Sequence, residues 1–229
     1  MTFPLLSSLI LLPLLGSLFI FFIREKTTKN YQSIKYVALF VSFSNFIISL
    51  YLWYLFDNSI SDFQFVEEKV WIKDFINYKV GVDGISILFI ILTTFIVPLC
   101  VVSINSNIKN RLKEFLIAVL IMESFMIGVF CSLDLIIFYL FFEGGLIPMF
   151  LIIGIWGGSR RVYSAFKFFL FTLLGSILML VAIITIYWIS DTTDITILYY
   201  LGIDPSYQKL LWLAFFSSFA VKTPYVAQF

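Results

Sequence analysis

The sequence predicts an all-α membrane protein of about seven transmembrane helices. Hydrophobic residues make up 61% of its 229 residues, and the mean hydropathy is +1.03. Soluble domains average roughly 45–50% apolar residues and about 25% charged residues. Only 13% of this chain is charged, which is too little to cover a water-facing surface of this size. Much of the surface is therefore expected to face lipid.

Long apolar stretches recur along the chain, and a helix needs about 20 such residues to cross a bilayer. We expect a single transmembrane domain over residues 1–229, with spans near 3–23, 36–56, 84–104, 115–131, 133–154, 163–188 and 209–227. Because only residues 132–134 separate the fourth span from the fifth, one long bent helix is an alternative there. Asp134 favours a turn between two helices.

Charge alternates between the loops. The loops after the first, third and fifth spans are basic and contain Arg24, Lys26, Lys29, Lys35, Lys109, Arg111, Lys113, Arg160 and Arg161. The other loops are acidic and contain Asp57, Asp62, Glu67, Glu68, Asp74, Asp83, Asp134, Asp191, Asp194 and Asp204. Short basic loops stay on the cytoplasmic or matrix side, so the amino terminus is expected outside.

The outer loop over residues 57–83 is the only sizeable extramembrane segment that the pattern predicts. Its apolar residues indicate a short amphipathic hairpin and include Phe63, Phe65, Val66, Val70 and Trp71. Asp83, between Gly81 and Gly84, is expected to cap the third span, because aspartate is a favoured N-cap residue.

Four ionisable residues within the predicted spans stand out as candidates for a functional site. A charge at the bilayer centre costs about 2.5–3.5 kcal/mol, so such residues usually face the protein interior and mark an ion path. Glu143 and Glu123 fall near mid-depth, and Lys222 lies within about one helical turn of the depth of Glu143. Lys167 is shallower and can reach the inner headgroups along its aliphatic stem.

Prolines follow two of these residues. Pro148 has no N–H to bond the carbonyl of Gly144, beside Glu143, and Pro224 has none for the carbonyl of Ala220, near Lys222. A helix break is therefore predicted after Lys222. Transporters place coupling ions at interrupted helices, so the pattern favours a site for charge-coupled proton transfer.

Structural alternatives stand beside this interpretation. Glu143 and Lys222 could form a buried ion pair that only holds two helices together. Glu123 could pair with a neighbouring helix, and Lys167 could be an ordinary interfacial lysine.

Cofactor and nucleic-acid sites are not expected. The chain has no histidine, and Cys100 and Cys131 stand singly in apolar runs, so ligand sets for haem, iron–sulfur clusters or zinc are missing. The 15 basic and 14 acidic residues nearly cancel, which predicts no nucleic-acid partner. Electron transfer would have to occur in other chains.

Three segments resemble the NADH dehydrogenase subunit 4 family, the antiporter-like proton-pumping subunits of respiratory complex I. They are GVDGIS from Gly81 to Ser86, FYLFFEGGLIPMFLIIGIWGGSRRVYSAFKFFLFTLLGSILML from Phe138 to Leu180, and LWLAFFSSFAVKTP from Leu211 to Pro224. The resemblance implies that Glu143 and Lys222 are the functional charge pair of a proton channel. Lys167 and Glu123 match less uniform positions of the family.

The resemblance also implies a function and a location. The chain would be a core membrane subunit of NADH:ubiquinone oxidoreductase in the inner mitochondrial membrane, in contact with lipids and other membrane-arm subunits. FMN, iron–sulfur clusters and ubiquinone would belong to partner subunits. The excess of phenylalanine and isoleucine fits an AT-rich organellar gene. The alternatives are a stand-alone multi-subunit cation/proton antiporter and a structural scaffold.

Family members usually carry about twice as many spans, arranged as two inverted repeats. This sequence matches only their amino-terminal half and ends at Phe229, so no internal repeat is visible. Either a separate polypeptide supplies the second half or the chain is truncated, and we expect a split subunit.

Overall fold

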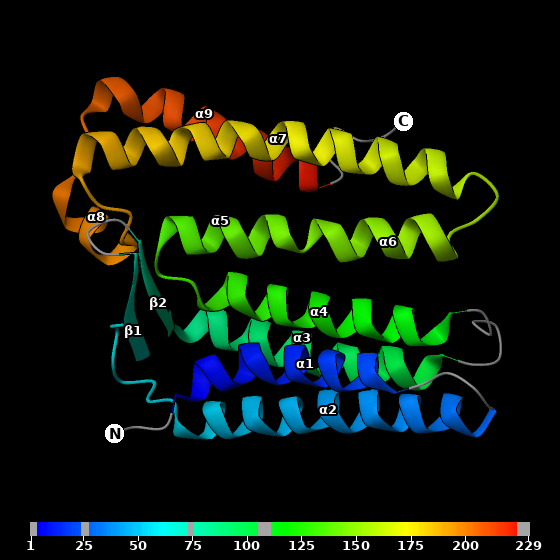
Figure 1. Cartoon of the computed structure of the whole chain (residues 1–229). Coiled ribbons are helices and arrows are strands. Elements are labelled where there is room, and N and C mark those ends of the chain that lie inside the picture. The colour runs from blue at the N-terminus through cyan, green and yellow to red at the C-terminus, as the bar shows by residue number, and fades with distance from the viewer. Residues whose placement is uncertain (1–3, 24–27, 73–75, 105–110, 224–229) are drawn as a thin grey trace. The chain divides into compact units, whose positions relative to one another are not determined.

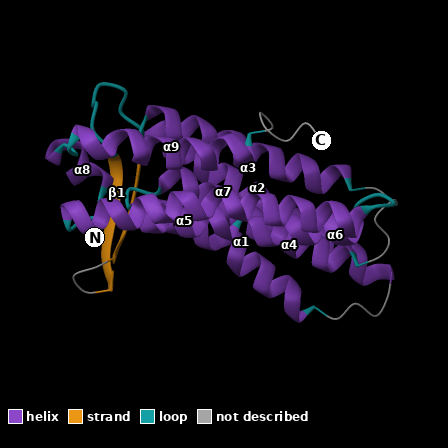
Figure 2. Cartoon of the chain, turned by 90° about the horizontal axis from the view of Figure 1, so that it is seen from above, coloured by secondary structure: helices purple, strands orange, loops and turns teal. Residues whose placement is uncertain are grey.

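The computed structural model describes residues 4–23, 28–72, 76–104 and 111–223. Most of these residues are helical, and two strands form one hairpin (Figure 2). They belong to two compact units: a first unit of Met1–Glu67 with Val80–Ser132, and a second unit of Glu68–Lys79 with Leu133–Phe229. The single domain predicted over residues 1–229 stays a prediction. Some residues named in the sequence predictions lie outside the described ranges, namely Arg24, Lys26, Asp74, Lys109 and Pro224.

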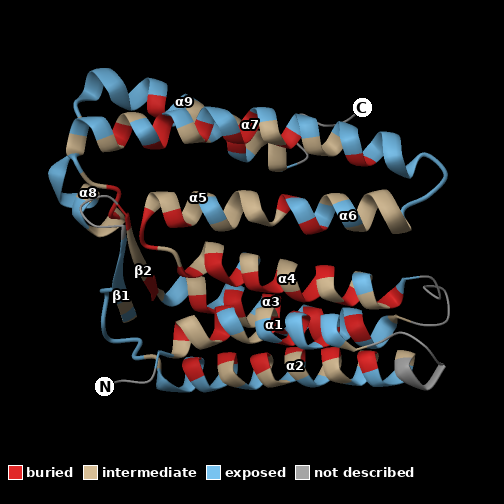
Figure 3. Cartoon of the chain, viewed as in Figure 1, coloured by how far each residue is buried: buried red, intermediate tan, exposed pale blue. Residues whose placement is uncertain are grey.

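The first unit contains four long helices (Figure 1). They are α1 (Leu5–Phe22), α2 (Thr28–Leu55), α3 (Gly84–Ser103) and α4 (Leu112–Cys131). Helix α4 packs against each of the other three. Its buried residues recur along its length (Figure 3), and Leu116, Leu120 and Ile127 are fully buried. The core of this unit therefore lies around α4.

The second unit contains the remaining described helices, which are α5 (Leu135–Gly144), α6 (Leu146–Trp156), α7 (Arg161–Ser190), α8 (Ile195–Leu201) and α9 (Pro205–Lys222). Helix α7 packs against α5, α6 and α9. Gly175 lets α9 lie close to α7, because a Cβ atom at this position would be only 2.9 Å from the Cβ of Val221. Val221 precedes Lys222, so this contact positions the end of α9.

The predicted hairpin is confirmed, while its place on the outer side stays a prediction. Strand β1 (Gln64–Ile72) pairs with β2 (Ile76–Val82). The predicted cap of the third span is also confirmed, since the Asp83 side chain accepts a hydrogen bond from the Ser86 N–H at 2.7 Å. Glu67 of β1 accepts from the backbone N–H groups of Leu6 and Ser7, at 2.8 and 3.1 Å. The hairpin thus supplies acceptors to the start of α1, where backbone N–H groups lack helical partners.

The predicted spans agree with the helices in most respects. Among the described residues, six helical stretches are long and apolar enough to cross a membrane, against about seven predicted. Helix α9 corresponds to the predicted last span, but Gln208, Lys209 and Lys222 make it more polar than those six. Helix α4 ends at Cys131 and α5 begins at Leu135, so the alternative of one long helix is excluded.

Lysines bind the carboxyl ends of two helices in the first unit. Lys35 Nζ donates to the carbonyls of Val102 and Ile104, at 3.1 and 2.6 Å, where α3 ends. Lys113 Nζ donates in the same way to Phe21 and Ile23, at 2.7 and 2.8 Å, where α1 ends. A cation is favourable at a helix carboxyl end because the last carbonyls carry partial negative charge.

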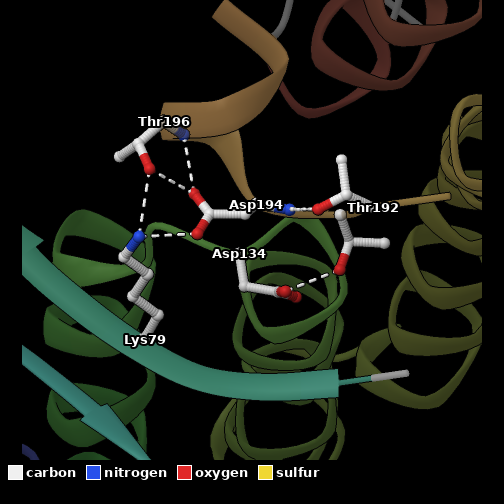
Figure 4. Close-up of polar contacts among 6 residues, drawn as sticks. Lys79, Asp134, Thr192, Asp194 and Thr196 are labelled. Atoms are coloured by element: carbon white, nitrogen blue, oxygen red, sulfur yellow. Dashed lines mark hydrogen bonds and ion pairs between the residues drawn. The ribbon is translucent and has the colours of Figure 1, made fainter. Parts of the chain in front are cut away.

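An ion pair joins the hairpin segment of the second unit to the start of α8 (Figure 4). Lys79 Nζ lies 2.6 Å from an Asp194 carboxylate oxygen and 3.0 Å from the Thr196 hydroxyl. Asp194 also caps α8 by accepting from the Thr196 N–H at 2.8 Å. Burial acts to raise the pKa of Asp194, but the hydrogen bonds from Lys79 and Thr196 outweigh it, so the pKa lies below its ordinary value.

We expect Asp194→Asn to lower the free energy of unfolding by about 2 kcal/mol, because it removes charged hydrogen bonds and leaves Lys79 without its carboxylate. A depressed folded-state pKa stabilises the fold above the unfolded-state pKa, and this contribution is lost as pH falls through the folded-state pKa. The difference between the native chain and the variant should therefore shrink on acidification.

Thermal unfolding in detergent, at neutral and at acidic pH, measures this difference. Asp191→Asn is the matched control, because Asp191 is exposed and close in sequence. Equal losses in the two variants would show that the Lys79–Asp194 pair does not stabilise the unit.

Candidate functional site

A helix break lies beside Glu143. Helix α5 ends at Gly144 and α6 begins at Leu146, and together they form the predicted fifth span. Pro148 lies in the first turn of α6 and cannot donate to the Gly144 carbonyl, which is the physical reason for a break here. Glu143 therefore lies where the regular hydrogen bonding of the helix is interrupted.

Lys222 is the last residue of α9, and Thr223 after it is extended, so α9 ends where the break is predicted; the residues after Thr223 lie outside the described ranges. Lys222 Nζ donates to the Phe142 carbonyl at 2.8 Å and lies 3.0 Å from the centre of the Phe142 ring. Phe219, one turn earlier in α9, packs edge-on against this ring, with 5.8 Å between ring centres. Phe142 thus holds the ammonium by its backbone and by its aromatic face.

Glu143 and Lys222 belong to one site without forming an ion pair. Among the described residues the ion pairs are Lys79–Asp194 and Arg111–Glu114. The two residues are linked through Phe142, whose carbonyl binds the Lys222 ammonium and which directly precedes Glu143 in the chain. Glu143 Oε2 is buried and has no hydrogen-bond partner among the described residues. A carboxyl oxygen without a partner, near an ammonium, is a chemically suitable proton acceptor.

Two further polar residues of this site were not predicted. Tyr139, one turn before Glu143 on α5, is half-buried. Ser218, one turn before Lys222, is 1% exposed, and its hydroxyl has no partner in the described part of the chain. The sequence could have indicated both residues by their spacing. Each lies four residues before a predicted site residue, and residues four apart share a helix face.

Glu123 lies in the first unit and is fully buried. Its Oε1 atom accepts from Asn45 Nδ2 of α2 at 2.9 Å, while Oε2 has no partner among the described residues. The interhelical pairing expected as one alternative is therefore observed. Asn45 was not predicted, because an asparagine in a span gives no strong sequence signal.

Lys167 lies near the start of α7 in the second unit and is exposed. Within the described residues it forms neither an ion pair nor a hydrogen bond, so the structure does not bring it into contact with Glu143 or Lys222. This position agrees with the alternative of an interfacial lysine.

Comparison with known proteins places these features in context. Residues 132–227 match a family described as NADH:quinone oxidoreductase/Mrp antiporter, TM. NADH-ubiquinone oxidoreductase chain 4 of Marchantia polymorpha is 48% identical, over 96% of this chain and 44% of its own length. NADH-quinone oxidoreductase subunit M of Rhodobacter capsulatus is 52% identical, over 84% of this chain and 40% of its own length.

A solved structure is also similar. A chain of respiratory complex I from Thermus thermophilus with bound NADH has a TM-score of 0.81 and 26% identity, covering 96% of this chain and 44% of its own. This chain thus spans less than half the length of the relatives that it matches. Over nearly its whole length, the chain is therefore related to the amino-terminal part of NADH-ubiquinone oxidoreductase chain 4 and NADH-quinone oxidoreductase subunit M.

Proposed function

We propose that this chain is a membrane subunit of a proton-translocating NADH:ubiquinone oxidoreductase, in which it carries part of a proton path. Electron transfer from NADH to ubiquinone would take place in other subunits. The observation that carries the proposal is the Lys222 ammonium, held at a helix end by the backbone of Phe142, which directly precedes Glu143 and its buried Oε2 atom in the chain. The similarity to complex I subunits supports the same proposal.

Glu143 and Lys222 act as proton relay groups in this proposal. The neutral Phe142 carbonyl can accept a hydrogen bond from a lysine in either protonation state, because a neutral amine still has N–H donors. The charge of Glu143 then biases whether Lys222 holds its proton. A change in the charge or position of Glu143 would drive transfer. Lys167 and Glu123 are proposed as further relay groups.

Cofactors, partners and location follow from the same proposal. FMN, iron–sulfur clusters and ubiquinone are proposed in partner subunits, in keeping with the lack of histidine and the single cysteines of this chain. Other membrane-arm subunits and lipids would surround it in the inner mitochondrial membrane.

Purification through a tag on this chain tests the function. We expect NADH-driven quinone reduction to co-purify with the chain, and the reconstituted complex to acidify one side of the vesicle while NADH is oxidised. Cation/proton exchange without any redox activity would instead support the antiporter alternative. Mass spectrometry of the same preparation identifies the partner subunits.

A further inference from the structure

A buried amide and a buried carboxyl group meet in the first unit, and each has one atom without a partner. Asn45 and Glu123 are both 0% exposed. Asn45 Nδ2 donates to Glu123 Oε1 at 2.9 Å. The other oxygen of each group, Asn45 Oδ1 and Glu123 Oε2, has no hydrogen-bond partner among the described residues. Buried polar atoms are nearly always hydrogen-bonded, so this pair of exceptions calls for a physical reason.

The protonation state of Glu123 supplies that reason. An ionised carboxylate offers only acceptors, so it cannot satisfy the amide oxygen of Asn45. A protonated carboxyl group has one O–H donor. A proton on Glu123 Oε2 would provide the missing donor to Asn45 Oδ1, and both unpartnered oxygens would then be satisfied by one hydrogen bond.

The described cations on the helices around Glu123 are engaged elsewhere. Helices α1, α2 and α3 pack against α4, and α1 and α3 contain no charged residue. On α2, Lys35 binds the carboxyl end of α3, and on α4, Lys113 binds that of α1. Arg111 pairs with Glu114 at the exposed start of α4. The other titratable groups described on these helices are the exposed or half-buried Tyr31, Tyr36, Tyr51, Tyr54 and Cys100, and the buried Cys131 at the end of α4.

We propose that Glu123 carries a proton and forms a ring of two hydrogen bonds with Asn45. Asn45 Nδ2 donates to Glu123 Oε1, and the protonated Oε2 donates to Asn45 Oδ1. Asn45 is then a positioning residue that fixes the carboxyl group and its proton between α2 and α4. The inference rests on the proposed function only for the use of this proton, since the ring itself requires no pumping.

Infrared spectroscopy of the purified complex tests the ring. The difference between the native complex and Glu123→Gln should contain the carbonyl band of a protonated carboxyl group at neutral pH, and this band should move to lower frequency in D₂O. Asn45→Leu should move it to higher frequency, because the carbonyl loses its N–H donor. Asn45→Ser, which removes the amide and leaves a small polar side chain, replaces it should Asn45→Leu fail to assemble.

Ser49→Ala is the matched control, because Ser49 lies one turn further along α2 and bonds Thr94 instead of Glu123. It should leave the band in place. Absence of the band, or no movement of it in either Asn45 variant, would overturn the ring. Measuring proton pumping in the same preparations separates the two proposals. If the band behaves as expected but the native complex does not pump protons, the ring is supported and the proposed function is contradicted.

Discussion

Lys222→Met is expected to reduce proton pumping by about 100-fold or more while the complex still assembles. Methionine is unbranched, flexible and close in length to lysine, so it can pack against the Phe142 ring. It has no proton to exchange and no N–H for the Phe142 carbonyl. The measurement is NADH-driven proton transfer in reconstituted vesicles, with native gel electrophoresis to check assembly.

Lys222→Arg separates a relay from an anchor. Arginine keeps the positive charge and the hydrogen-bond donors but does not release its proton in proteins. If Lys222 must release a proton, Lys222→Arg should pump as poorly as Lys222→Met. Lys209→Met is the matched control, since Lys209 is exposed on the same helix and should leave pumping unchanged. Normal pumping by the arginine variant would mean that Lys222 only fixes the helices.

Glu143→Gln is expected to reduce pumping by a similar factor of about 100 or more. Glutamine keeps the shape of the side chain, so α5 and α6 should remain in place. It cannot exchange a proton, so the relay loses the carboxyl group that follows the Phe142 acceptor of Lys222 in the chain. Proton transfer driven by NADH again measures the effect, together with the rate of NADH oxidation.

Glu114→Gln serves as the control for the loss of a carboxylate, because Glu114 is exposed and pairs with Arg111 at the start of α4. Glu143→Asp tests whether the carboxyl group itself is needed, and it should retain more activity than Glu143→Gln. Pumping by Glu143→Gln at the native rate would refute the role of Glu143 as a relay group.

The sequence was sufficient to predict most of the fold. Composition and hydropathy predicted the long helices, and the turn chemistry of Asp83 and Asp134 predicted two helix starts, both of which are capped by these side chains. These features depend on neighbouring residues, so they are visible without tertiary contacts. The division into two compact units depends on packing and was not predicted.

The site was predicted less completely. Residue type and depth identified Glu143 and Lys222, and proline identified the two breaks. The direct partner of Lys222 is the carbonyl of Phe142, and a backbone atom leaves no trace in residue type. Asn45 was missed because its importance comes from one contact with a residue 78 positions away. Lys167 was included because of its place in a span and its match to a less uniform family position, and in this chain it is exposed near the start of α7.

The acceptor of the Lys222 hydrogen bond is a backbone carbonyl, and this affects how Phe142 tolerates substitution. Every amino acid has a carbonyl oxygen, so no replacement of Phe142 can delete the atom that receives the lysine hydrogen bond. Substitution there removes only the aromatic face. The hydrogen bond that positions Lys222 therefore depends on the backbone conformation at the end of α5. It is more robust to single mutations than a hydrogen bond between two side chains.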